Sequence, residues 1–105
     1  MAVAEIFRAL GDPVRLEMVQ RLSSGAPCTI STVSNQLGIT RQGARKHLQV
    51  LADASIVTMR PKGRDVFVEL DRSSLDQAEQ FIRELERRWD QRLTALKSLL
   101  EDNER

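Results

Sequence analysis

Apolar residues recur every three or four positions in the first part of the chain, a spacing that predicts helices. The stretch from Val3 to Leu10 forms the first pattern, and Gly11 ends it. Asp12-Pro13 then supplies an N-cap and a proline at the first helical position, where the missing N–H costs nothing. A second helix follows, with a core-facing stripe of Leu16, Val19 and Leu22. We assign residues 3–28 to scaffold helices.

Residues 29–53 contain two shorter helical patterns separated by a tight break. The first pattern opens on Thr29 or Ser31 as its N-cap, and Gly38 is expected to end it, because a left-handed terminal residue costs glycine least. Thr40 caps the second helix. That helix has an apolar face of Ala44, Leu48 and Leu51, and an opposite polar face of Arg41, Gln42, Arg45, Lys46 and Gln49.

The polar face predicts a helix-turn-helix whose second helix enters DNA. Arginine and glutamine near a helix N-terminus can bond base edges with two hydrogen bonds each, and Thr40 with the free N–H groups of the first turn can hold a phosphate. Gly43 keeps the side chain minimal where this helix approaches the groove. Charged faces are also common on helices that only contact solvent, so the segment after this helix bears on the interpretation.

That following segment, residues 56–70, predicts a β-hairpin. Ile56 to Arg60 and Val66 to Leu70 are expected strands, joined by the turn Pro61 to Asp65. Lys62 and Arg64 flank the turn glycine. A hairpin directly after a recognition helix can act as a wing that reaches the DNA backbone, and the alternative is a solvated loop with chance charges.

The last pattern, residues 72–101, predicts one long helix capped by Asp71 or Ser73. Its apolar positions step by three or four residues, close to a coiled-coil seam: Leu75, Ala78, Ile82, Leu85, Trp89, Leu93, Leu96 and Leu100. At 1.5 Å per residue such a helix is about 40 Å long, more than one small domain can cover. We therefore expect a homodimer with Val3, Ile6, Phe7, Leu85, Trp89, Leu93 and Leu96 in its interface. The alternative is a helix packed entirely on its own domain.

Composition places the chain among globular proteins of one domain, residues 1–105, with 41% hydrophobic and 30% charged residues. No signal peptide and no apolar run near the roughly 20 residues that span a bilayer are evident, so we expect a cytoplasmic protein without membrane contact. The net charge is only +1, yet residues 40–64 hold six basic residues against one acidic. A basic patch confined to one segment is typical of a nucleic-acid surface.

Candidate chemistry is sparse. The single cysteine, Cys28, cannot form an internal disulfide, and with the single histidine, His47, it cannot build a metal site unaided. A thiol sensor at Cys28 is the alternative to a plain small residue. His47 lies beside the core positions of its helix, which favours a structural role. No catalytic residues and no cofactor are expected, so the sequence does not indicate an enzyme.

Three segments in order resemble the ArsR-type winged-helix regulators. They are the run from Phe7 to Leu16 (FRALGDPVRL), the run from Arg41 to Leu51 (RQGARKHLQVL), and Gly63-Arg64 before a strand. The resemblance covers nearly the whole chain. It implies a dimeric bacterial transcription factor, usually a repressor that leaves DNA when an effector binds.

The chain departs from the metal-sensing members of that family. Thr29 and Ser31 stand where those members carry a Cys-x-Cys pair, and the last helix has acidic residues but no histidine. Thiolate or imidazole ligands are what holds a soft or borderline metal ion. Because the chain lacks such a set of ligands at these positions, we expect no metal site. The operator and the effector do not follow from the sequence.

These observations predict a mainly α protein: a winged helix-turn-helix with a two-stranded β wing and a long C-terminal dimerisation helix. The predicted function is regulation of transcription by a homodimer on a palindromic operator in double-stranded DNA, with contacts from Thr40, Arg41, Gln42, Arg45, Lys46, Gln49, Lys62 and Arg64. The rival interpretation is a protein-interaction module that uses the same fold without binding DNA.

Overall fold

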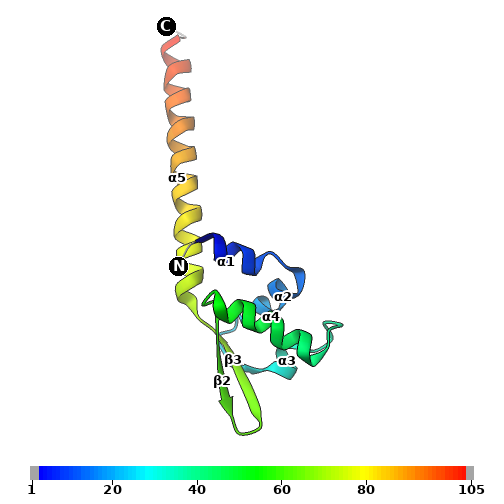
Figure 1. Ribbon diagram of the computed structural model, residues 1–105. Helices are drawn as coiled ribbons and strands as arrows, with labels where there is room; N and C mark the ends of the chain where they lie inside the picture. Colours follow the sequence, from blue (N-terminus) through cyan, green and yellow to red (C-terminus); the bar gives the residue numbers. More distant parts are fainter. Residues whose placement is uncertain (1–2, 104–105) are drawn as a thin grey trace.

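The computed structural model describes residues 3–103, in which five helices and three short strands follow one another along the chain. In order they are α1 (Val3–Leu10), α2 (Pro13–Arg21), β1 (Cys28–Thr29), α3 (Ile30–Ser34), α4 (Arg41–Asp53), β2 (Val57–Lys62), β3 (Asp65–Leu70) and α5 (Arg72–Asn103). Elements α1 to β3 pack into a small body, and most of α5 projects from it (Figure 1). The molecule measures 74 × 25 × 23 Å for this reason.

The core lies where α1, α2, α3 and α4 meet the inner face of the sheet. Its largest fully buried apolar side chains are Ile6, Met18, Leu22, Val33, Leu48, Leu51, Ile56 and Val68. The expected stripe of α2 was partly wrong, because Leu16 is 46% exposed. Leu22 is fully buried and Val19 packs against the core, as expected, while Met18, four residues before Leu22, faces the core where Leu16 does not. Val14 packs beside Met18 against the same core.

The sheet has three antiparallel strands in the order β1-β3-β2, one more than the predicted two-stranded wing. Strand β1 pairs Cys28 with Val68 and Thr29 with Phe67. The hairpin of β2 and β3 is also tighter than predicted, since Lys62 pairs directly with Asp65. Only Gly63 and Arg64 form the turn, and Gly63 adopts a φ of +63°, which glycine tolerates best.

Helix α3 ends at Ser34, four residues before the expected stop at Gly38. The Arg21 guanidinium donates to the carbonyl oxygens of Val33 and Asn35, at 3.3 and 2.6 Å, and so satisfies acceptors at this helix end. Gln36 then turns the chain with a φ of +61°, and Gly38 follows with +71°. The segment between α3 and α4 is therefore a loop, and it is longer than the tight break at Gly38 that we predicted.

The base of α5 is fixed to the body by a hydrogen bond and by ring packing. Ser74 is 1% exposed, and its hydroxyl donates to the Ala54 carbonyl at 2.9 Å. Helix α1 packs across the same part of α5, where the rings of Phe7 and Phe81 meet edge to face with centroids 5.8 Å apart. From Phe81 to Asp102 every side chain except Glu84 is exposed. No helix among residues 3–103 is long and apolar enough to cross a membrane.

Candidate nucleic-acid interface

The N-terminal end of α4 has a cap that leaves backbone N–H groups free to bind an anion. Thr40 is in extended conformation, and its hydroxyl oxygen accepts the Gly43 N–H at 2.9 Å. The cap satisfies one of the four free N–H groups of the first turn and leaves others open. A Cβ on Gly43 would lie 3.2 Å from the Thr40 hydroxyl oxygen, so the glycine makes room for the cap. This is a different reason for the glycine than the close approach to DNA that we expected.

The two faces of α4 are divided as the sequence pattern predicted. Ala44, Leu48 and Leu51 are fully buried. The opposite, polar face consists of Arg41, Gln42, Arg45, Lys46 and Gln49, all exposed, and we call it the reading face. Within residues 3–103 none of its three cations takes part in an ion pair. The Gln49 side chain is hydrogen-bonded within α4, because its amide nitrogen donates to Asp53 at 2.8 Å.

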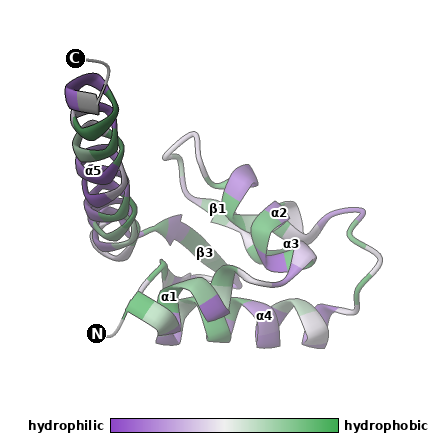
Figure 2. Cartoon of the chain, turned by 90° about the horizontal axis from the view of Figure 1, so that it is seen from above, coloured by the Kyte–Doolittle hydropathy of each residue, from purple (hydrophilic) through white to green (hydrophobic). Residues whose placement is uncertain are grey.

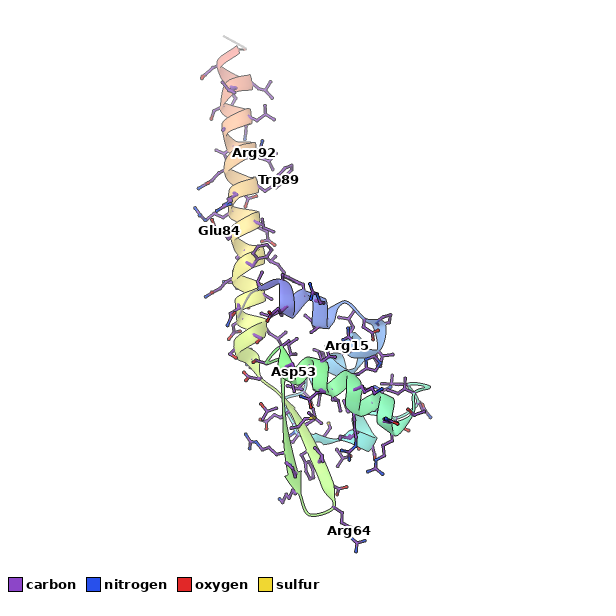
Figure 3. All side chains as sticks on the ribbon, in the orientation of Figure 1. Arg15, Asp53, Arg64, Glu84, Trp89 and Arg92 are labelled. Atoms are coloured by element: carbon purple, nitrogen blue, oxygen red, sulfur yellow. The ribbon has the colours of Figure 1, made fainter. Side chains whose placement is uncertain are left out.

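The wing carries three cations in two different settings. Arg64 lies in the turn, and its side chain extends beyond the hairpin (Figure 3). Lys62 is the last residue of β2, not a turn residue as predicted, and it shares one face of that strand with Arg60. The sequence analysis did not place Arg60 among the DNA-contacting residues. The alternation of Thr58, Arg60 and Lys62 with the inward Val57 and Met59 was the signal that could have found it.

A polar cluster behind the reading face connects α4 to the first two helices. The Arg15 guanidinium donates to the Ala9 carbonyl and lies 3.2 Å from His47 Nδ1. Because a guanidinium only donates, this contact is a hydrogen bond in the tautomer whose Nδ1 carries no hydrogen. Asp12 Oδ2 lies 3.9 Å from the same Nδ1. His47 therefore has the structural role that its position beside the core predicted.

Asp12 is held in its charged form by the start of α2. Its carboxylate accepts the backbone N–H groups of Val14 at 2.9 Å and Arg15 at 3.1 Å. The hydrogen bond from the Arg15 N–H is the largest cause that lowers the pKa of this carboxyl, and the nearby Arg15 and His47 charges act in the same direction. The cap thus fixes the turn that presents Arg15 to α4.

An apolar surface without a partner in the protomer runs along α5. Leu85, Trp89, Leu93 and Leu96, all expected in a dimer interface, are 50%, 61%, 47% and 53% exposed. Figure 2 shows hydrophobic and hydrophilic residues alternating around α5. Phe81, which the predicted seam omitted, is 43% exposed and extends this surface toward Phe7. Its spacing of four residues from Leu85 was the available signal.

The N-terminal members of the expected interface lie in different environments. Val3 is half-buried against the core and Phe7 is 37% exposed. Ile6 is fully buried inside its own protomer, so it supports α1 from beneath and presents no surface to a partner. Cys28 is half-buried. Among residues 3–103 no three histidine, cysteine or acidic side chains gather as metal ligands would.

These features together define a winged helix-turn-helix protein: α3 and α4 form the helix-turn-helix, and β2 with β3 forms the wing. Residues 10–60 match the family described as a helix-turn-helix domain. The chain is 40% identical over 65 residues to an HTH-type transcriptional regulator of Bacillus subtilis, YuzN, covering 56% of this chain and 71% of that protein. It is 30% identical over 95 residues to the HTH-type transcriptional regulator Rv2034 of Mycobacterium tuberculosis, covering 90% and 85%.

A solved structure extends the likeness to the fold. An ArsR-like transcriptional regulator from Rhodococcus sp. RHA1 superposes with a TM-score of 0.76 at 28% identity, covering 92% of this chain and 91% of that one. The chain belongs to the ArsR-type winged helix-turn-helix transcriptional regulators. It is a DNA-binding regulator of transcription, in agreement with the resemblance of its sequence motifs.

Proposed function

We propose that this protein is a homodimeric repressor that binds a palindromic operator and reads it with α4. The observation that carries the proposal is the reading face, whose exposed cations have no ionic partner among residues 3–103 and stand on a helix fixed by three fully buried side chains. A rigid helix with free guanidinium groups suits the major groove, where arginine bonds guanine with two hydrogen bonds. We propose repression, not activation, of transcription because of the resemblance to the family.

The polar residues take different roles in this proposal. Arg41, Gln42 and Arg45, nearest the N-terminus of α4, bond base edges. Thr40 and the open N–H groups of the first turn hold a phosphate, which the positive end of the helix dipole favours. Lys46 and Gln49 lie further along the helix, and Gln49 must leave Asp53 to reach DNA. In the wing, Lys62 and Arg64 contact backbone phosphates, and Arg64 has the better position because it lies in the turn.

The proposed dimer is formed by α5 with part of α1. Its interface contains Val3, Phe7, Leu85, Trp89, Leu93 and Leu96, with Phe81 added from the structure. Eleven large apolar side chains are more than a third exposed, and eight of them lie on α5 between Phe81 and Leu100. Exposed apolar surface of this extent marks an interaction site. A second copy is the occupant that a palindrome requires, because two-fold symmetry sets the separation of two reading helices at about 34 Å.

Selection of bound fragments from genomic DNA tests this proposal. We expect an enriched palindrome with half-sites about 10 base pairs apart, centre to centre, bound by two chains. A matched variant, Arg45→Ala, should enrich the same fragments less selectively. No enriched motif, or a motif without internal symmetry bound by one chain, would contradict the proposed function.

A further inference from the structure

The outer face of the sheet holds a hollow that is separate from the reading face. Its volume is about 340 Å³, and it is lined by Pro27, Thr58, Arg60, Lys62, Phe67 and Glu69. Val57 and Val68, on the other face of the same strands, are buried in the core with α4. Since neighbouring residues of a strand point to opposite faces, the hollow opens away from α4.

Pairing of β2 with β3 arranges the lining in successive rows. Arg60 is directly opposite Phe67, and Thr58 is directly opposite Glu69. Lys62 follows Arg60 toward the tip of the wing. The hollow therefore has Lys62 at the tip end, Arg60 and the half-buried Phe67 ring opposite each other in the middle, and a carboxylate with a hydroxyl at the base end.

The charges in this hollow are not neutralised by one another. None of Arg60, Lys62 and Glu69 forms an ion pair or a side-chain hydrogen bond within residues 3–103. The negative charge of Glu69 repels a nucleic-acid backbone, because such a backbone presents only anions. A small molecule with unlike ends satisfies both ends of the hollow, and a volume near the lower limit for ligand pockets suits a single ring.

We propose that this hollow binds an aromatic carboxylic acid that carries a hydroxyl or amino group at its far end. The carboxylate pairs with Arg60 and Lys62, the ring lies against Phe67 and Pro27, and the far group donates to Glu69. Rows two residues apart along a strand are separated by about 7 Å, which matches the length of a benzene ring with substituents at opposite positions. Apolar lining with a few convergent polar groups is the usual composition of such sites.

Occupation of the hollow has a consequence for DNA binding. Lys62 is one of the proposed phosphate contacts. A ligand carboxylate bound to Lys62 neutralises the charge of this lysine and so lowers the affinity of the protein for the operator. This consequence, unlike the ligand site itself, rests on the proposed function. The acid would then act as an effector that releases the repressor.

Titration of the full chain with 4-hydroxybenzoate, followed by amide NMR shifts without DNA, tests the site. We expect saturable shifts at Arg60 and Phe67 with a dissociation constant of about a millimolar or below, the range open to so small a ligand. Phenol, which lacks the carboxylate, should bind at least tenfold more weakly. Arg60→Gln should weaken binding at least tenfold, while the matched control Arg72→Gln, an exposed arginine at the start of α5, should not.

Shifts that do not saturate, or that are the same in Arg60→Gln and the wild type, would overturn the site. Circular dichroism of Arg60→Gln shows that the variant is folded, and Phe67→Leu supplies a second test in which the stacking surface is lost but both cations remain. Anisotropy of the selected operator with and without the acid tests the consequence separately. Absence of DNA binding altogether would contradict the proposed function and leave the NMR result to decide the ligand site.

Discussion

Replacement of Trp89 by alanine should dissociate the proposed dimer without touching the reading face. Trp89 is 61% exposed in the protomer, compared with 43% for Phe81 and 37% for Phe7. A tryptophan contributes about 250 Å² at most, so roughly 150 Å² of it is open to a partner. At about 25 cal/mol per Å² this area is worth about 4 kcal/mol for each ring. The estimate falls within the about 3 to 5 kcal/mol that truncation of a buried tryptophan costs.

Since every 1.4 kcal/mol changes an equilibrium constant about tenfold, loss of one ring alone should raise the dimer dissociation constant by roughly three powers of ten. Sedimentation at micromolar concentration measures this, and we expect a wild-type dimer and a monomeric Trp89→Ala. Operator affinity should fall as well, because two reading helices no longer bind as one unit. Gln91→Ala is the matched control: Gln91 is exposed, two residues along α5, and about 200° around the helix from Trp89.

A wild-type monomer at this concentration would refute the reasoning. So would a Trp89→Ala variant that stays dimeric and keeps its DNA affinity, because the long helix would then serve another partner. Equal weakening in Gln91→Ala would show that the substitution acts on α5 itself and not on an interface.

Other predictions concern single sites. Arg41→Ala and Arg45→Ala should each weaken specific binding by about 1 to 3 kcal/mol and relax sequence preference, whereas Lys62→Ala should weaken binding equally on all sequences and reduce the salt slope by about one; identical behaviour of all three would contradict the division of roles. Asp12 has a lowered pKa, so its contribution to stability is present above its ordinary value of 3.8 and is lost as the pH falls from there through the lowered value. Asp12→Asn keeps a good N-cap, and acid melts of that variant should lose this component, while an unchanged pH profile would argue against it. Zinc, cadmium and nickel should not release the operator, and stoichiometric release at micromolar metal that survives Cys28→Ser would prove this wrong.

Much of the fold followed from local patterns because those elements are stabilised locally. The Asp12-Pro13 start of α2, the Thr40 cap of α4 and the buried side of α4 all depend on residues a few positions apart. Strand β1 escaped prediction because it is two residues long and exists only through pairing with β3, nearly forty positions later. The early end of α3 escaped for the same reason, since Arg21 of α2 takes the carbonyl of Asn35.

The candidate site was predictable to the extent that strand and helix periodicity set which side of an element a residue occupies. The reading face of α4 therefore appeared from spacing alone. The hairpin turn did not, because a five-residue turn and a two-residue turn around Gly63 have nearly the same sequence signal, and the shorter one moves Lys62 into β2. The contact of Arg15 with His47 joins residues 32 positions apart and has no local signature.

Salt-dependent binding of the selected operator and of a scrambled duplex tests the central claim most directly, namely that α4 reads DNA sequence. The logarithm of the binding constant should fall linearly with the logarithm of salt concentration on both duplexes, because phosphate contacts release counterions. At one physiological salt concentration the operator should bind at least about a thousandfold more tightly than the scrambled duplex. Equal affinity for the two duplexes, or no binding to either at low salt, would contradict the account.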